Sequence, residues 1–181
     1  SRSAMINRIL ADYVSYVTPE QRLRDILGKA AELVSAMDQM QVMLQPTDTH
    51  LALKSALRYK YNPTVKYSVE LYKSGSALGE LRVTMRTQNK GLIACLTEFF
   101  RLWAAVEQLV LGTLPECAAG EGKYTRILHL DPQEAQQATG DMVGRAIMDY
   151  VHLLDRCMKL WFEAYAEGVD PGEQIVRLYR E

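Results

Sequence analysis

The residues with the most evident chemistry are the cations between positions 54 and 90. This segment carries eight lysines and arginines against two glutamates, although the whole chain has a net charge of −1. Residues 91–181, in contrast, hold eight basic and fourteen acidic side chains. The positive charge is therefore concentrated in one stretch, and lysine and arginine are the side chains that neutralise nucleic-acid phosphates.

Four tyrosines are interleaved with these cations: Tyr59, Tyr61, Tyr67 and Tyr72. Aromatic rings stack on unpaired bases and contribute about 1–3 kcal/mol per base. We therefore predict a non-catalytic protein that binds RNA or single-stranded DNA. The expected contact residues are Arg58, Lys60, Lys66, Tyr72, Lys73, Arg82, Arg86 and Lys90.

The same segment allows other interpretations. The chain can be a protein–protein adaptor or scaffold subunit whose basic segment binds an acidic protein partner. The cations can also be ordinary solvated side chains, because lysines on edge strands keep sheets of different molecules from pairing. Finally, the segment can face the acidic residues 91–181, within one chain or between two copies.

Arg145 and His152 are the weaker candidates for catalysis. They lie seven residues apart, which places them on one face of a helix, two turns apart. This pair resembles the motif of the HEPN-domain ribonucleases, which are helical and act as dimers. The resemblance implies that Arg145 stabilises charge on an RNA phosphodiester while His152 moves protons. The structural alternative is that Arg145 forms ion pairs with Asp141 and Asp149, four residues away on either side.

No motif for a metal or a cofactor is present. The three histidines are far apart in the sequence, and the chain has no HExxH, CxxC, GxxxxGK[ST] or GxGxxG pattern. The three cysteines form no spacing typical of a disulfide framework, which favours a reducing, intracellular compartment. The longest apolar stretch, residues 102–111, is too short to span a membrane. We therefore expect no cofactor, no metal and no membrane partner.

The elements that must position the basic segment follow from hydrophobic periodicity. Residues 64–87 alternate between apolar and polar with a period of two, which predicts a β-hairpin with one wet face. Lys66, Arg82 and Arg86 belong to that wet face together with Tyr72. Residues 123–130 are a candidate third strand beside the hairpin. We expect the apolar face of the hairpin to pack on a helix at 92–111.

A helical period dominates the rest of the chain. Helices are expected at about 5–17, 19–44, 49–60, 91–112 and 132–167. The helix at 19–44 carries an apolar seam that either packs inside its own bundle or pairs with a second copy, so we expect a homo-oligomer. Gly140 and Gly144 indicate a kink or a close helix contact at the start of the last helix.

These elements predict a predominantly helical α+β domain. We expect four to five helices with a two- or three-stranded antiparallel sheet packed on one side. Residues 5–181 are taken as a single domain, and residues 1–4 as the remnant of an expression tag.

Overall fold

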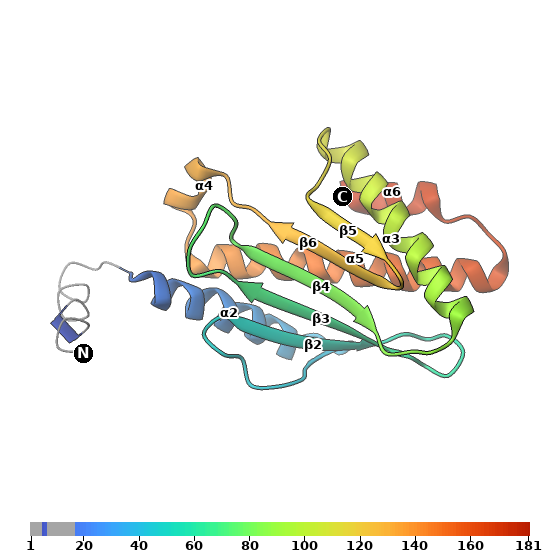
Figure 1. The fold of residues 1–181 in the computed structure, drawn as a ribbon, viewed down its shortest axis with the longest axis horizontal. Helices are drawn as coiled ribbons and strands as arrows, with labels where there is room; N and C mark the ends of the chain where they lie inside the picture. The colour runs from blue at the N-terminus through green and yellow to red at the C-terminus, as the bar shows by residue number, and fades with distance from the viewer. Residues whose placement is uncertain (1–4, 7–16) are drawn as a thin grey trace.

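The computed structural model describes residues 5–6 and 17–181. These residues form one antiparallel sheet of six strands in the order β1-β2-β3-β4-β6-β5 (Figure 1). The strands are β1 (Met40–Val42), β2 (His50–Ala56), β3 (Thr64–Leu71), β4 (Gly79–Met85), β5 (Cys117–Gly120) and β6 (Lys123–Leu128). The described helices are α2 (Pro19–Ser35), α3 (Lys90–Leu111), α4 (Pro132–Gln137), α5 (Gly140–Glu167) and α6 (Gly172–Arg180).

Helices α3 and α5 cover the same face of the sheet. Tyr67, Val83 and Tyr124 are direct cross-strand neighbours on β3, β4 and β6, so their side chains leave the sheet on one side. The Tyr67 hydroxyl reaches α5, and the Tyr124 ring stacks on Phe100 of α3 at 5.2 Å between ring centroids. Helix α2 packs along α5 and against β1 and β2, whereas α6 packs on α3.

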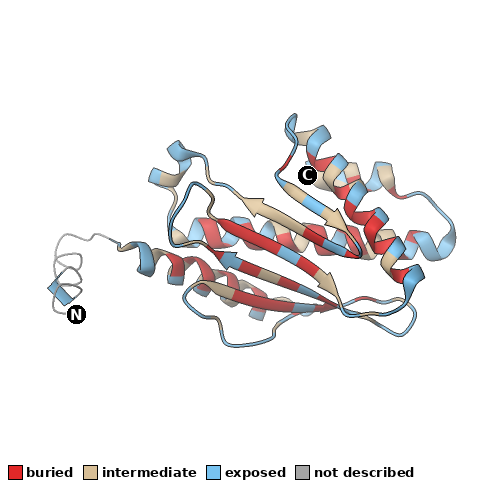
Figure 2. Cartoon of the chain, in the orientation of Figure 1, coloured by how far each residue is buried: buried red, intermediate tan, exposed pale blue. Residues whose placement is uncertain are grey.

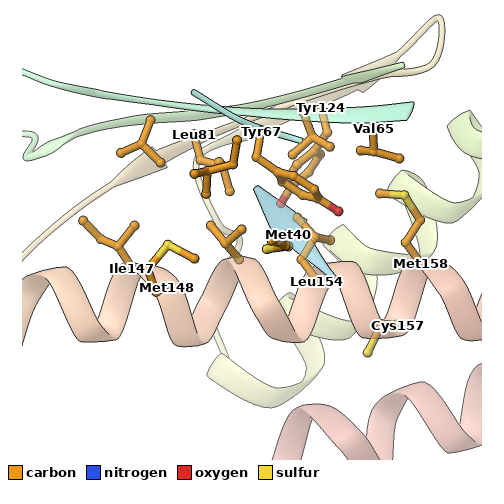
Figure 3. Packing of buried hydrophobic residues seen from close by; sticks show 14 of the residues in the cluster. Met40, Val65, Tyr67, Leu81, Tyr124, Ile147, Met148, Leu154, Cys157 and Met158 are labelled. Atoms are coloured by element: carbon orange, nitrogen blue, oxygen red, sulfur yellow. The ribbon is translucent and has the colours of Figure 1, made fainter. Parts of the chain in front are cut away.

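The predicted hairpin is confirmed as β3 and β4. Along β3, Val65, Tyr67, Val69 and Leu71 are buried and alternate with exposed or half-buried residues, as Figure 2 shows. Gly79 begins β4 where a Cβ atom would lie 2.1 Å from the carbonyl oxygen of Glu70, so only glycine fits there. The apolar face of this hairpin lies over α5, as Figure 3 shows. Helix α3, on which the hairpin was expected to pack, shares the same core cluster and, of the strands, contacts mainly β5 and β6.

The predicted size of the sheet was wrong, because two segments assigned to helices are strands. The segment at 49–60 contains β2, and the Thr47 hydroxyl accepts hydrogen bonds from the backbone N–H groups of Thr49 and His50 in a turn before that strand. The predicted helix at 19–44 ends at Ser35 and is followed by β1. With β5 and β6 added, the sheet has six strands and not two or three.

Helices α3 and α5 follow the prediction more closely. The segment predicted at 91–112 forms α3, and the third-strand candidate at 123–130 contains β6, which pairs with β4. The helix expected at 132–167 is interrupted at residues 138–139, where Thr139 caps the start of α5. Gly144 confirms the expected close helix contact, because a Cβ atom there would lie 2.4 Å from the Ile26 carbonyl oxygen of α2.

The apolar seam of residues 19–44 packs inside the chain. Leu23, Ile26, Ala30 and Val34 of α2 are all buried in the core. The seam does not continue past α2 as a helix, since Met40 is part of β1. Self-association therefore remains a prediction that no longer rests on this seam, and the helix predicted at 5–17 lies largely outside the described residues.

Candidate nucleic-acid interface

The outer face of the sheet, opposite to α3 and α5, carries two of the eight predicted binding residues, Lys66 and Arg82. Strand register places Lys54, Lys66, Thr84 and Lys123 as successive cross-strand neighbours on β2, β3, β4 and β6. Three of the four residues in this row are therefore lysines, and all three are exposed. We call Lys54, Lys66 and Lys123, together with Thr84 in the same row, the lysine row.

The rows that follow the lysine row toward the β3–β4 turn give the outer face a charge gradient along the strands. One step further along lie Ser68 and Arg82, and one step beyond them lie Glu70 and Glu80, opposite each other on β3 and β4. Successive rows on one face are separated by about 7 Å. The face is therefore basic near the β2–β3 loop and acidic near the β3–β4 turn.

The lysines of the row have no ion-pair partner in the part of the chain that the structure describes. Arg82 is the outer-face cation that does pair, with Glu80 of its own strand. Lys54 and Lys66 face each other directly, an arrangement of like charges that destabilises a sheet. A bound polyanion would relieve this repulsion.

The basic end of the face continues into the loops beyond β2 and β4. Arg86 directly follows β4, and Lys60 lies in the β2–β3 loop. Both residues line a cavity of about 420 Å³ together with Tyr59, Tyr61 and Tyr165. We call the lysine row, Arg86 and Lys60 together the basic end.

The backbone of the β2–β3 loop is strained at two successive residues. Tyr61 has a φ angle of 67° and Asn62 one of 43°, in the left-handed region that residues other than glycine rarely adopt. Asparagine tolerates this region, but a bulky residue held there costs about 1–3 kcal/mol. The Tyr61 side chain is nevertheless 96 % exposed, so burial of its ring does not offset the strain.

The structure does not bring all the predicted site residues together. Tyr72 and Lys73 follow β3 at the opposite, acidic end of the sheet, where burial and the nearby Glu80 raise the pKa of Tyr72. Arg58 lines a second cavity of about 730 Å³ near α5 and α6, which Lys54 of the lysine row also lines. Lys90 is exposed at the first position of α3, next to residues that line the smaller cavity.

The predicted contact residues did not include Lys54 or Lys123 of the lysine row, or Tyr165 of the loop cavity. Lys123 lies far from the 54–90 segment and joins the lysine row only because β6 pairs with β4. The signal that would have found it was the alternation along the third-strand candidate, combined with an assumed pairing to the hairpin. Tyr165 comes from the last turns of α5, which the sequence could not place beside the β2–β3 loop.

Arg145 and His152 lie on α5, away from the basic end. Arg145 is exposed and His152 is half-buried, and neither forms a side-chain hydrogen bond or ion pair with any described residue. The predicted ion pairs of Arg145 with Asp141 and Asp149 are therefore absent from the described part of the chain. The six-stranded sheet also differs from the helical fold that the HEPN resemblance implies.

Two buried carboxylates lie beneath the sheet and have structural partners. Asp155 of α5 accepts hydrogen bonds from Tyr67 at 2.7 Å and Ser55 at 3.1 Å, and it pairs with Lys159 at 2.7 Å. Burial, reinforced by the charge of Asp155, raises the pKa of Tyr67.

Glu107 of α3 is the second buried carboxylate. It accepts hydrogen bonds from Tyr124 at 2.8 Å and Tyr179 at 3.2 Å, and Arg126 lies 3.4 Å away. Asp155 therefore links α5 to β2 and β3, and Glu107 links α3 to β6 and α6, both on the helix-covered side of the sheet.

The described residues contain no group of three or more histidine, cysteine or acidic side chains placed to hold a metal ion. No helix in that part of the chain is both long and apolar enough to cross a membrane. Comparisons with protein-family models, with curated proteins and with solved structures found no match to this chain.

Proposed function

We propose that the chain binds single-stranded RNA or DNA through the basic end of its open sheet face. The observation that supports this proposal is the register that aligns Lys54, Lys66 and Lys123 in one row. Three exposed lysines without carboxylate partners in the described structure form a surface suited to a phosphate backbone. Arg86 and Lys60 extend it toward the loop tyrosines.

The acidic row of Glu70 and Glu80 gives the proposed surface a boundary. Glu70 is exposed and repels a nucleic-acid strand, whereas Glu80 is buried and paired with Arg82. Because the lysine row attracts the strand, the bound strand lies near the β2–β3 loop. Tyr72 and Lys73 lie beyond this boundary and are not included in the proposed interface.

Charge reversal on the open face tests the proposal. Lys66→Glu combined with Lys123→Glu should weaken binding of a fluorescent single-stranded oligonucleotide at least about tenfold, because two phosphate contacts become repulsive. Fluorescence anisotropy at constant salt measures the change. Both side chains are exposed, so the variant should fold, which circular dichroism verifies.

The matched control is Arg177→Glu with Arg180→Glu, which changes the net charge by the same amount on α6. This control and Lys73→Glu should both bind like the unmodified chain. Equal losses in the two double variants would mean that only net charge matters and would overturn the proposal. Absence of oligonucleotide binding at low salt, together with capture of an acidic protein, would favour the adaptor function instead.

A further inference from the structure

The cavity of about 420 Å³ beside the β2–β3 loop is lined by three tyrosines and two cations. Its size falls within the range of small-ligand sites, about 300–1,000 Å³. Tyr59, Lys60 and Tyr61 contribute from the loop, Arg86 comes from the end of β4, and Tyr165 comes from α5. No carboxylate of the described residues lines it.

The tyrosines of the cavity differ in how firmly they are held. Tyr59 is half-buried and packs on Phe162 of the core, with 5.1 Å between ring centroids. Tyr61 is almost fully exposed and Tyr165 is about half exposed, and neither ring packs on another aromatic ring within the described structure. The cavity therefore has one fixed aromatic wall and two rings available for stacking.

The strained backbone at Tyr61 keeps one of these rings at the mouth of the cavity. The Asn62 N–H donates to the Tyr59 carbonyl oxygen at 2.8 Å, and the Leu57 N–H donates to the Pro63 carbonyl oxygen at 2.9 Å. These two bonds close the loop tightly around Tyr61. Neither burial nor packing of the Tyr61 side chain offsets this backbone strain. Backbone strain of this kind is found mostly at functional sites.

The polar groups of the cavity suit a ligand that is anionic at one side and planar at the other. Lys60 and Arg86 supply positive charge for a phosphate. Asn89 uses its side-chain oxygen to cap α3 by accepting from the Leu92 N–H at 3.0 Å, so its amide NH₂ remains a donor. Nucleotides combine a phosphate with a planar base that carries hydrogen-bond acceptors.

We propose that this cavity receives one unpaired base of the bound strand, stacked on Tyr61 or Tyr165, while Lys60 and Arg86 hold the adjoining phosphate. The inference rests on the proposed function, because Arg86 and Thr87 of the cavity directly follow β4, which carries Thr84 of the lysine row. It adds that the site selects single strands over duplexes, in which bases are not free to stack on protein.

Tyr61→Gly is the most informative variant, because glycine adopts a positive φ angle without strain. The fold should be as stable as before or more stable, whereas binding of a single-stranded oligonucleotide should weaken between about 5-fold and 150-fold. Tyr165→Ala should weaken binding in the same direction, and Tyr61→Phe should retain it. Tyr72→Ala, at the opposite end of the sheet, is the matched control and should leave binding unchanged.

An abasic oligonucleotide of the same length separates this inference from the proposed function. The unmodified chain should bind it as weakly as the Tyr61→Gly variant binds the ordinary strand, with the same dependence on salt. Equal binding of abasic and ordinary strands, with no effect of Tyr61→Gly or Tyr165→Ala, would overturn the base-binding cavity and leave the basic surface in place. No binding of either strand by the unmodified chain at low salt would overturn both.

Discussion

Residues on the two faces of the sheet differ in whether their polar side chains have partners inside the chain. On the inner face, Tyr67 and Tyr124 bury their rings and give their hydroxyl groups to Asp155 and Glu107. On the outer face, Lys54 and Lys66 lie opposite each other with no internal partner among the described residues. The two buried carboxylates are thus paired, whereas the outward lysines have no carboxylate partner among the described residues.

The inward tyrosines predict that the chain loses stability at alkaline pH. Burial, followed by the charge of Asp155, raises the pKa of Tyr67, and burial is also the main cause of the raised pKa of Tyr124. In the unfolded chain both titrate near pH 10. Above that pH the unfolded state releases protons that the folded state still holds, so the free energy of unfolding should fall by up to about 1.4 kcal/mol per pH unit for each tyrosine.

Urea unfolding between about pH 8 and pH 11 measures this dependence. The contribution is fully present below pH 10 and is lost as the pH rises toward the folded-state pKa. Tyr67→Phe should make the decline less steep, because it removes one of the titrating groups. A free energy of unfolding that stays constant across this range in the unmodified chain would show that the two hydroxyl groups are not buried as described.

At the scale of elements, the close contact between α2 and α5 fixes the helical layer beneath the sheet. Gly144 of α5 lies against the backbone of α2, where a Cβ atom would come within 2.4 Å of the Ile26 carbonyl oxygen. Gly140, one turn earlier, lies equally close to α2, since a Cβ atom there would be 2.7 Å from the Cβ atom of Asp25. This pair of glycines sets how near the two helices approach.

Gly144→Ala should lower the free energy of unfolding by about 1–3 kcal/mol, because the added methyl group forces the two helices apart. Gly28→Ala on α2 is the matched control, since no atom lies within 4 Å of a Cβ atom built there. That control should raise stability by about 0.5–1 kcal/mol, as alanine does in an open helix position. Chemical denaturation of both variants checks the contrast, and equal effects would contradict the packing.

Sequence periodicity was enough to assign some strands and helices of this chain but not others. Residues 64–87 could be assigned to a hairpin because every second side chain of β3 is buried against helices. Strand β2 was mistaken for a helix, because Leu51, Ala52 and Leu53 form a short apolar run that fits both periods. Strand β1 has only three residues and depends on pairing with β2, which no local pattern reveals.

For the molecule as a whole, the net charge of −1 conceals an uneven distribution. The sequence placed the positive charge in one segment, and alternation correctly assigned Lys66 and Arg82 to the outer face. It could not show that Lys123 joins them from β6, or that Tyr165 joins the loop cavity from α5, because both depend on tertiary contacts. It also grouped Tyr72 and Lys73 with residues from the other end of the sheet.

The dependence of binding on salt tests the central claim most directly. If Lys54, Lys60, Lys66, Arg86 and Lys123 each neutralise one phosphate, the logarithm of the binding constant for a single strand should fall with the logarithm of salt concentration with a slope of about −3.5. That slope corresponds to roughly a hundredfold loss of affinity between about 50 and 200 mM salt. A salt-independent affinity, or no binding even at the lowest salt, would contradict the account.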